Sequence, residues 1–113
     1  GNYCVAGGDF NKDLPGNSGD LFGVPANESG AWAQPIPDGT IPEGLRLVVP
    51  LHEDAPVASC RTASEPYDIA TSFRITVDGF VVSDNVTVLD SNVIDTQFQY
   101  SDHNPVYMDF LLD

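Results

Sequence analysis

The amino-acid sequence predicts a sheet-rich α+β fold with little helix and one long loop. Three observations favour this class. The apolar segments are short, several of them alternate apolar with polar residues, and no segment shows helical apolar spacing over three turns. Residues 11–44 are rich in Pro, Gly, Asn and Asp, which is typical of irregular structure. A chain of 113 residues has the length of one domain.

The first half of the chain contains few regular elements. Asn2–Ala6 is predicted to be a short buried strand that ends at Gly7 and Gly8, where the backbone can turn tightly or approach a ligand. The irregular region 11–44 leaves room for a short helix near Ser18–Phe22. Two further apolar runs predict brief strands, Leu45–Pro50 and Val57–Cys60.

The second half is more regular. Phe73, Ile75 and Val77 alternate with polar residues, so residues 72–83 are predicted to form one continuous strand. Asp84 and Asn85 predict a turn. The remaining strand candidates are Val86–Leu89, Val93–Phe98 and Val106–Leu112.

The charge of the chain restricts its partners. Four basic and 17 acidic residues give a formal net charge of −13, which disfavours nucleic-acid binding through phosphate contacts. An acidic surface also repels anionic substrates unless a bound cation reverses the local field. No apolar run reaches the roughly 18 residues that a membrane span requires, and no segment has the pattern of a secretory signal.

For four isolated residues the sequence favours a structural role over a functional one. Cys4 and Cys60 are too few for a disulfide framework and are predicted to be small core residues. His52, among acidic neighbours, is predicted to lie on the surface. For Arg61, the sequence favours a salt bridge to an acidic residue over contact with a substrate phosphate.

The segment GGDFNKDLPGNSGD, residues 7–20, is consistent with a calcium loop as well as with the rim of a cleft. Asp9, Asn11 and Asp13 alternate as the first oxygen ligands of such a loop do. Position six is Leu14 instead of Gly, and position twelve is Asp20 instead of Glu. A non-catalytic β-sandwich module that binds calcium through this loop is therefore the alternative hypothesis.

Three ordered motifs together predict a function. They are GDFN at 8–11, ITVDGFVVSDNV at 75–86 and SDHNP at 101–105. In this order the motifs resemble those of the endonuclease/exonuclease/phosphatase family of metal-dependent phosphoester hydrolases. That family includes deoxyribonuclease-like nucleases, sphingomyelinases and inositol-polyphosphate phosphatases. The resemblance implies a catalytic cleft formed by the ends of the strands.

The resemblance assigns a role to each matched residue. Asp9 would orient the attacking water, and Asn11 would hydrogen-bond the phosphoryl oxygens. His103 would act as general base or as the cation that stabilises the phosphorane, and Asp78 would accept the other ring N–H of His103. Asp102 would bind the divalent metal, Mg²⁺ or Mn²⁺. A carboxylate beside an imidazole and hard oxygen ligands for Mg²⁺ are both chemically suited to these roles.

The resemblance covers only the second half of the family's domain, a two-sheet αββα sandwich. The first half of that domain supplies an Asn, the principal metal-binding Glu and a further His or Tyr. The glutamates of this chain all follow the GDFN motif and are Glu28, Glu43, Glu53 and Glu65. We therefore expect residues 1–113 to be the C-terminal portion of one such domain and to be inactive alone.

Two further expectations follow from a half domain. An uncovered apolar sheet face would favour self-association or strand exchange. The low basic content favours a small or lipid-derived phosphoester as substrate rather than duplex DNA.

Overall fold

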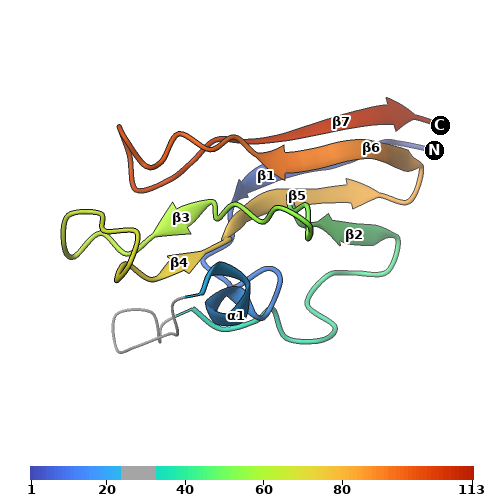
Figure 1. The fold of residues 1–113 in the computed structure, drawn as a ribbon. Helices are drawn as coiled ribbons and strands as arrows, with labels where there is room; N and C mark the ends of the chain where they lie inside the picture. Colours follow the sequence, from blue (N-terminus) through green and yellow to red (C-terminus); the bar gives the residue numbers. More distant parts are fainter. Residues whose placement is uncertain (24–32) are drawn as a thin grey trace.

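The computed structural model describes residues 1–23 and 33–113 and shows a sheet-rich fold with little helix (Figure 1), which confirms the prediction of a sheet-rich chain with little helix. Pro25 and Glu28, which belong to the predicted irregular region, lie outside the described residues. The described part forms three small antiparallel sheets and one short helix. Both chain termini lie at the same end of the molecule (Figure 1). No helix in the described ranges has the length and apolarity needed to cross a bilayer.

The largest sheet has three antiparallel strands in the order β1-β5-β2. They are β1 (Val5–Asp9), β5 (Asp78–Ser83) and β2 (Leu45–Val48). β5 lies in the centre, where its register pairs Asp9 with Asp78 and Gly8 with Gly79. Residues that are directly opposite on neighbouring strands project from the same face. This register therefore brings the two carboxylates together at one end of the sheet.

Two smaller ladders complete the described sheet structure. β3 (Cys60–Arg61) pairs with β4 (Arg74–Ile75). The long hairpin of β6 (Val86–Val93) and β7 (Val106–Leu112) has an irregularity in its register between Val88 and Asp90. The turn predicted at Asp84 and Asn85 is present between β5 and β6, and the predicted strand 106–112 is confirmed.

The helix α1 (Ser18–Phe22) forms where the sequence predicts it. Its start is held by the buried Asp13, whose carboxylate accepts hydrogen bonds from the Ser18 hydroxyl (2.6 Å) and the Ser18 backbone N–H (3.2 Å). The helix ends at Gly23 with a φ of 81°, the left-handed conformation that glycine adopts without strain. The buried Ser18 hydroxyl also accepts the backbone N–H of Thr76, so α1 is tied to the end of β4.

The prediction of one continuous strand over residues 72–83 is wrong, because the chain changes sheets at Thr76 and Val77. The Ser59 hydroxyl accepts the backbone N–H groups of Val77 (3.0 Å) and Asp78 (3.2 Å). The Val77 carbonyl accepts the Phe10 backbone N–H at 2.9 Å. These partners replace ladder hydrogen bonds at the break, so the backbone polar groups there stay satisfied.

Strand boundaries elsewhere also differ from the predictions. β6 continues through Val93, whereas the predicted strand Val93–Phe98 does not continue beyond its first residue. Gln97 and Phe98 have φ values of 57° and 53°, which an extended strand does not accommodate. The predicted strand Val57–Cys60 is shifted, because β3 covers Cys60–Arg61.

Three expectations about the first strand are wrong. All five residues of β1 are exposed, because β1 is an edge strand whose faces are not covered by the described part of the chain. Cys4 is exposed for the same reason, while Cys60 is buried as predicted. Gly7 and Gly8 lie inside the strand instead of forming a turn, and a Cβ at Gly7 would come within 2.8 Å of the Phe80 ring.

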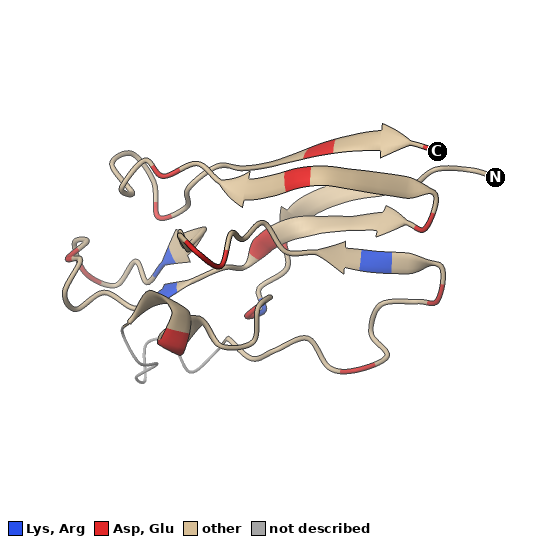
Figure 2. Ribbon diagram, turned by 45° about the vertical axis from the view of Figure 1, so that its right-hand side comes forward, with Lys and Arg blue, Asp and Glu red and all other residues tan. Residues whose placement is uncertain are grey.

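A cluster of buried apolar residues lies beside the β3–β4 ladder and consists of Cys60, Phe73, Ile75 and Val77. Acidic residues are spread over strands and loops, and basic residues are few (Figure 2). Several large apolar side chains remain exposed on or next to the strands β1, β6 and β7. They are Tyr3, Val5, Leu89, Phe110, Leu111 and Leu112.

Candidate active site

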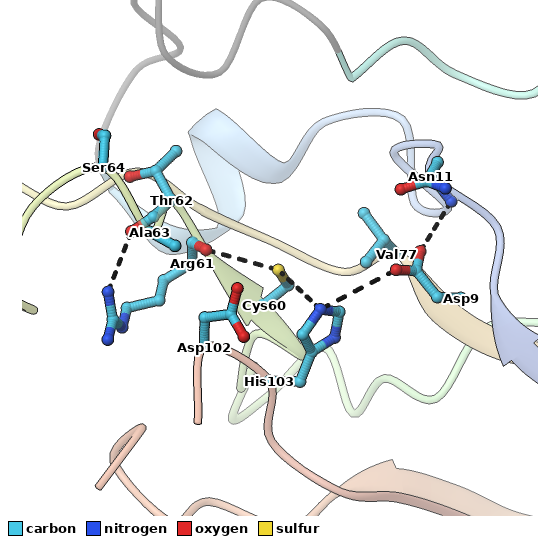
Figure 3. A pocket seen from close by; sticks show the side chains of 10 residues that line it. All are labelled: Asp9, Asn11, Cys60, Arg61, Thr62, Ala63, Ser64, Val77, Asp102 and His103. Atoms are coloured by element: carbon cyan, nitrogen blue, oxygen red, sulfur yellow. Dashed lines mark hydrogen bonds and ion pairs between the residues drawn. The ribbon is translucent and has the colours of Figure 1, made fainter. Parts of the chain in front are cut away.

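A pocket of about 370 Å³ lies where the three motifs meet (Figure 3). Asp9 and Asn11 come from the first motif and its loop, Val77 from the second, and Asp102 and His103 from the third. The remaining lining residues belong to β3 and the loop after it: Cys60, Arg61, Thr62, Ala63 and Ser64. Segments far apart in the sequence therefore supply one site.

His103 reaches the pocket because its segment pairs with the strand β3. An isolated antiparallel bridge joins Cys60 to His103, with backbone hydrogen bonds from Asn104 N–H to the Ser59 carbonyl (2.7 Å) and from Arg61 N–H to the Asp102 carbonyl (3.0 Å). The side chain of Asn104 is buried, and its amide donates to the Ala58 carbonyl at 2.9 Å. Asn104 thus anchors the SDHNP segment, a role that the sequence did not reveal.

The imidazole of His103 lies between two carboxylates. Its Nδ1 is 2.7 Å from Asp78 Oδ2, and its Nε2 is 3.9 Å from Asp9 Oδ2. An ionised carboxylate only accepts hydrogen bonds, so Nδ1 carries the proton that is donated to Asp78. In the neutral ring, Nε2 therefore presents a lone pair toward the pocket.

The electrostatic surroundings favour the protonated imidazole. Partial burial lowers the pKa of His103, but the hydrogen bond to Asp78 and the negative charges of Asp78, Asp102 and Asp9 together raise it above the ordinary value of 6.5. The His103 side chain is 34% exposed, against 14% for Asp78. The ring is thus accessible from the pocket while its orienting carboxylate is shielded.

Asn11 is placed by a local turn. The Asp9 carboxylate accepts the Asn11 backbone N–H at 2.8 Å, which is an Asx turn, and Asn11 has a φ of 52°. Asparagine tolerates this left-handed conformation better than most residues. The chain therefore turns after the strand at Asn11, and the Asn11 side chain remains on the pocket rim (Figure 3).

Asp102 and Arg61 both line the pocket, and Arg61 forms no ion pair with any residue in the described part of the chain. The guanidinium group donates to the carbonyls of Thr62 (3.1 Å) and Glu65 (3.2 Å) and lies over the Tyr67 ring, 5.7 Å from its centroid. The salt bridge expected for Arg61 is thus not among the ion pairs of residues 1–23 and 33–113. The two carbonyls at Nη1 and the aromatic face favour the charged side chain on the pocket wall, whereas its buried Nε has no hydrogen-bond partner in the described part of the chain.

Cys60 lines the pocket beside His103, a placement that the sequence did not reveal. Its Sγ lies 3.6 Å from His103 Nε2 (Figure 3). Burial, followed by the charges of Asp102, Asp78 and Asp9, raises the pKa of Cys60 to about 12, so the resting side chain is a neutral thiol. No local pattern relates positions 60 and 103, because a cross-strand pair between distant segments creates the contact.

Asp9 is grouped with residues of the other motifs rather than with Asp13. One ligand atom from each of Asp9, Asp78 and His103 lies within 4.8 Å of the others. The Asp13 carboxylate holds the start of α1 and does not line this pocket. Asp9 and Asn11, two of the three residues that would alternate as oxygen ligands in a calcium loop, therefore line this pocket, whereas the third, Asp13, does not.

His52 lies outside the pocket. It is partly exposed, as predicted, and its Nε2 is 2.7 Å from Asp90 Oδ1. The other Asp90 oxygen accepts a hydrogen bond from the Tyr107 hydroxyl at 2.7 Å. His52 thus links the loop after β2 to the β6–β7 hairpin and provides an internal control for His103.

No family model matches this chain, no curated protein matches it significantly, and neither does any solved structure.

Proposed function

We propose that this pocket catalyses divalent-metal-dependent hydrolysis of a phosphoester. The observation that carries the proposal is the hydrogen bond between His103 Nδ1 and Asp78 Oδ2. It leaves Nε2 facing a pocket that Asp9, Asn11 and Asp102 also line. An imidazole oriented by a carboxylate is suited to accept a proton from water. The three sequence motifs that resemble the endonuclease/exonuclease/phosphatase family supply these same residues.

The roles proposed for the side chains are those that the family resemblance implies, and the positions of the side chains are compatible with them. His103 Nε2 accepts a proton as the water oxygen bonds to phosphorus, and the ester P–O bond breaks to release an alkoxide. The alkoxide takes a proton from solvent to become the alcohol, and the imidazolium returns its proton to solvent. Asp78 stabilises the imidazolium that forms, and Asp9, 3.9 Å from Nε2, orients the water. Asn11 donates its amide N–H to a phosphoryl oxygen.

The oxygen donors of the pocket fit a hard cation. Asp102 and Asp9 provide carboxylates and Asn11 provides an amide oxygen, which are ligand types that Mg²⁺ and Mn²⁺ prefer. In this proposal Asp102 is the principal ligand from the described residues. A bound divalent ion would offset the charge that develops on the phosphoryl group.

The substrate class follows from charge. The net charge of −13 disfavours an extended polyanion, so we propose a small or lipid-derived phosphoester. We further propose that the described sheets form part of a two-sheet αββα sandwich. No glutamate among the described residues lines the pocket, so we expect residues 1–113 alone to be a weak or inactive catalyst.

The first test is hydrolysis of bis(p-nitrophenyl) phosphate with Mg²⁺, Mn²⁺ or EDTA, for the wild type and the variants His103→Ala and His52→Ala. Any metal-dependent rate should fall about 10²- to 10⁴-fold in His103→Ala, because a general base contributes a factor of this size. His52→Ala should retain the rate, since His52 lies outside the pocket. Equal activity in wild type and His103→Ala would contradict the proposal.

A second measurement keeps the proposal testable when the chain is inactive. The ring signals of the two histidines are followed by NMR as Mg²⁺ and inorganic phosphate are added together. The proposal expects the His103 signal to move more than the His52 signal, and to move further with both components than with either alone. Absence of hydrolysis combined with an unperturbed His103 would overturn it.

A further inference from the structure

The wall of the pocket that carries Cys60 offers a different set of ligands from the oxygen donors assigned to Mg²⁺. There His103 Nε2 lies 3.6 Å from Cys60 Sγ and 3.9 Å from Asp9 Oδ2 (Figure 3). We propose that these three residues form a binding site for Zn²⁺ or a similar borderline-soft divalent ion. This combination of ligand types is the one that zinc selects in proteins.

The separation between sulfur and nitrogen matches a tetrahedral ion, whereas the Asp9 carboxylate must move toward Cys60 to become the third ligand, because Cys60 does not join Asp9 and His103 in a group within 4.8 Å. Zn–S bonds of about 2.3 Å and Zn–N bonds of about 2.05 Å at a tetrahedral angle place sulfur and nitrogen about 3.6 Å apart. Cys60 Sγ and His103 Nε2 are 3.6 Å apart. The same geometry with a Zn–O bond in place of the Zn–S bond places nitrogen and oxygen about 3.4 Å apart. Nε2 and Asp9 Oδ2 are 3.9 Å apart, and the Asp9 side chain is 38% exposed, so it has room to move closer.

The outer surroundings of the imidazole match those of a zinc-bound histidine. A ligating His generally donates its second ring N–H to a carboxylate, which fixes the tautomer and makes the ligating nitrogen more basic. His103 Nδ1 donates a hydrogen bond in this way to the shielded carboxylate of Asp78. The lone pair of Nε2 is therefore already directed at the side where Cys60 and Asp9 lie.

The charges of the site also favour a divalent ion. Binding must displace the proton of the Cys60 thiol, and coordination to zinc deprotonates a thiol outright. The negative charges of Asp9, Asp78 and Asp102 all act on Cys60. A divalent cation bound there would therefore be surrounded by compensating charge. The pocket provides space for a water molecule as fourth ligand, which is the arrangement of an open zinc site.

Occupation of this site has one consequence that rests on the proposed function. An ion on Nε2 removes the lone pair that would accept a proton from water, so Zn²⁺ should inhibit the Mg²⁺-dependent hydrolysis. The binding site itself does not depend on that activity. It can be tested on the reduced protein without any substrate.

The decisive experiment is a titration of the reduced chain with Co²⁺, a spectroscopic substitute for Zn²⁺. The proposal expects a near-ultraviolet thiolate-to-cobalt charge-transfer band that Zn²⁺ removes and a large excess of Mg²⁺ does not. Cys60→Ser should abolish the band, whereas Cys4→Ser should retain it, because Cys4 is the exposed second cysteine. No band in the wild type, or a band that survives in Cys60→Ser or disappears in Cys4→Ser, would overturn the proposal.

A variant that keeps all three ligands guards against misfolding of Cys60→Ser. Asp78→Asn should weaken Co²⁺ binding about 10- to 100-fold, the usual effect of losing a carboxylate that supports a ligating histidine. Far-ultraviolet circular dichroism of each variant establishes that it is folded. Unchanged Co²⁺ affinity in a folded Asp78→Asn would contradict the arrangement of Asp78, His103 and metal.

Discussion

His103 Nδ1 lies 2.7 Å from Asp78 Oδ2, although the two residues are 25 positions apart in the chain. Asp78 is the first residue of β5, and its carboxylate is more shielded than the imidazole. The register of β1 with β5 places Asp9 opposite Asp78. One sheet pairing therefore decides which carboxylates surround the imidazole, and the properties of His103 depend on that pairing.

Replacing Asp78 by Asn should lower the pKa of His103. In the wild type this pKa lies above 6.5, because the Asp78 hydrogen bond and nearby negative charges outweigh the effect of burial. NMR titration of the metal-free protein measures this pKa, with the His52 signal identified by its retention in His103→Asn. A His103 pKa that is the same in wild type and Asp78→Asn would show that the carboxylate does not act on the imidazole.

The same pair makes stability depend on pH. A pKa that is raised in the folded state contributes stability that is fully present below the unfolded value near 6.5 and is lost as pH rises through the folded value. Asp78→Asn should therefore destabilise the metal-free protein more at pH 5.5 than at pH 9. Urea denaturation at both values measures the difference, and an equal loss at both would contradict this linkage.

The two cysteines should differ strongly in reactivity. With a pKa of about 12, the thiolate fraction of Cys60 at pH 8 is about 10⁻⁴, and the residue is buried. Cys4 is exposed. A chromogenic disulfide reagent should titrate one thiol rapidly in the native protein and the second only on unfolding. Cys4→Ser should remove the rapid phase, whereas loss of this phase in Cys60→Ser would be contrary to expectation.

Gly79→Ala should destabilise the fold. The new Cβ would lie 2.7 Å from Leu14 Cδ1 and 2.9 Å from the Val48 carbonyl oxygen, and the backbone of the paired strand cannot easily move away. Overpacking of this kind costs about 1–3 kcal/mol of unfolding free energy. The matched control is Gly8→Ala directly opposite on β1, where a Cβ meets no atom within 4 Å. Denaturation that shows equal losses for both variants would count against this register.

Ser59→Ala should also reduce stability, because it removes the acceptor that replaces ladder hydrogen bonds at the break between β4 and β5. The buried Ser59 hydroxyl accepts the N–H groups of Val77 and Asp78, and leaving buried donors without an acceptor costs about 1–3 kcal/mol. Ser64→Ala on the exposed loop serves as control. Urea denaturation compares the two, and a neutral Ser59→Ala would mean that water replaces the hydroxyl.

Local patterns predicted the elements that depend on neighbouring residues. The helix Ser18–Phe22, the turn at Asp84 and Asn85 and the strand Val106–Leu112 are all found where composition and alternation placed them. The prediction of one strand over residues 72–83 was wrong. The alternation of apolar and polar residues continues through Thr76 and Val77, whereas the hydrogen-bond partners of these two residues come from other segments.

For the candidate site, the motifs identified Asp9, Asn11, Asp78, Asp102 and His103 as residues of interest, and their chemical roles remain predictions. Residue types and short spacings are properties of the chain alone, so the acidic charge and these side chains could be recognised without coordinates. The placement of Cys60 beside His103, the exposure of β1 and the anchoring by Asn104 depend on which strands pair. Such pairings join residues that no local period connects, because they result from burial and hydrogen bonding across the whole fold.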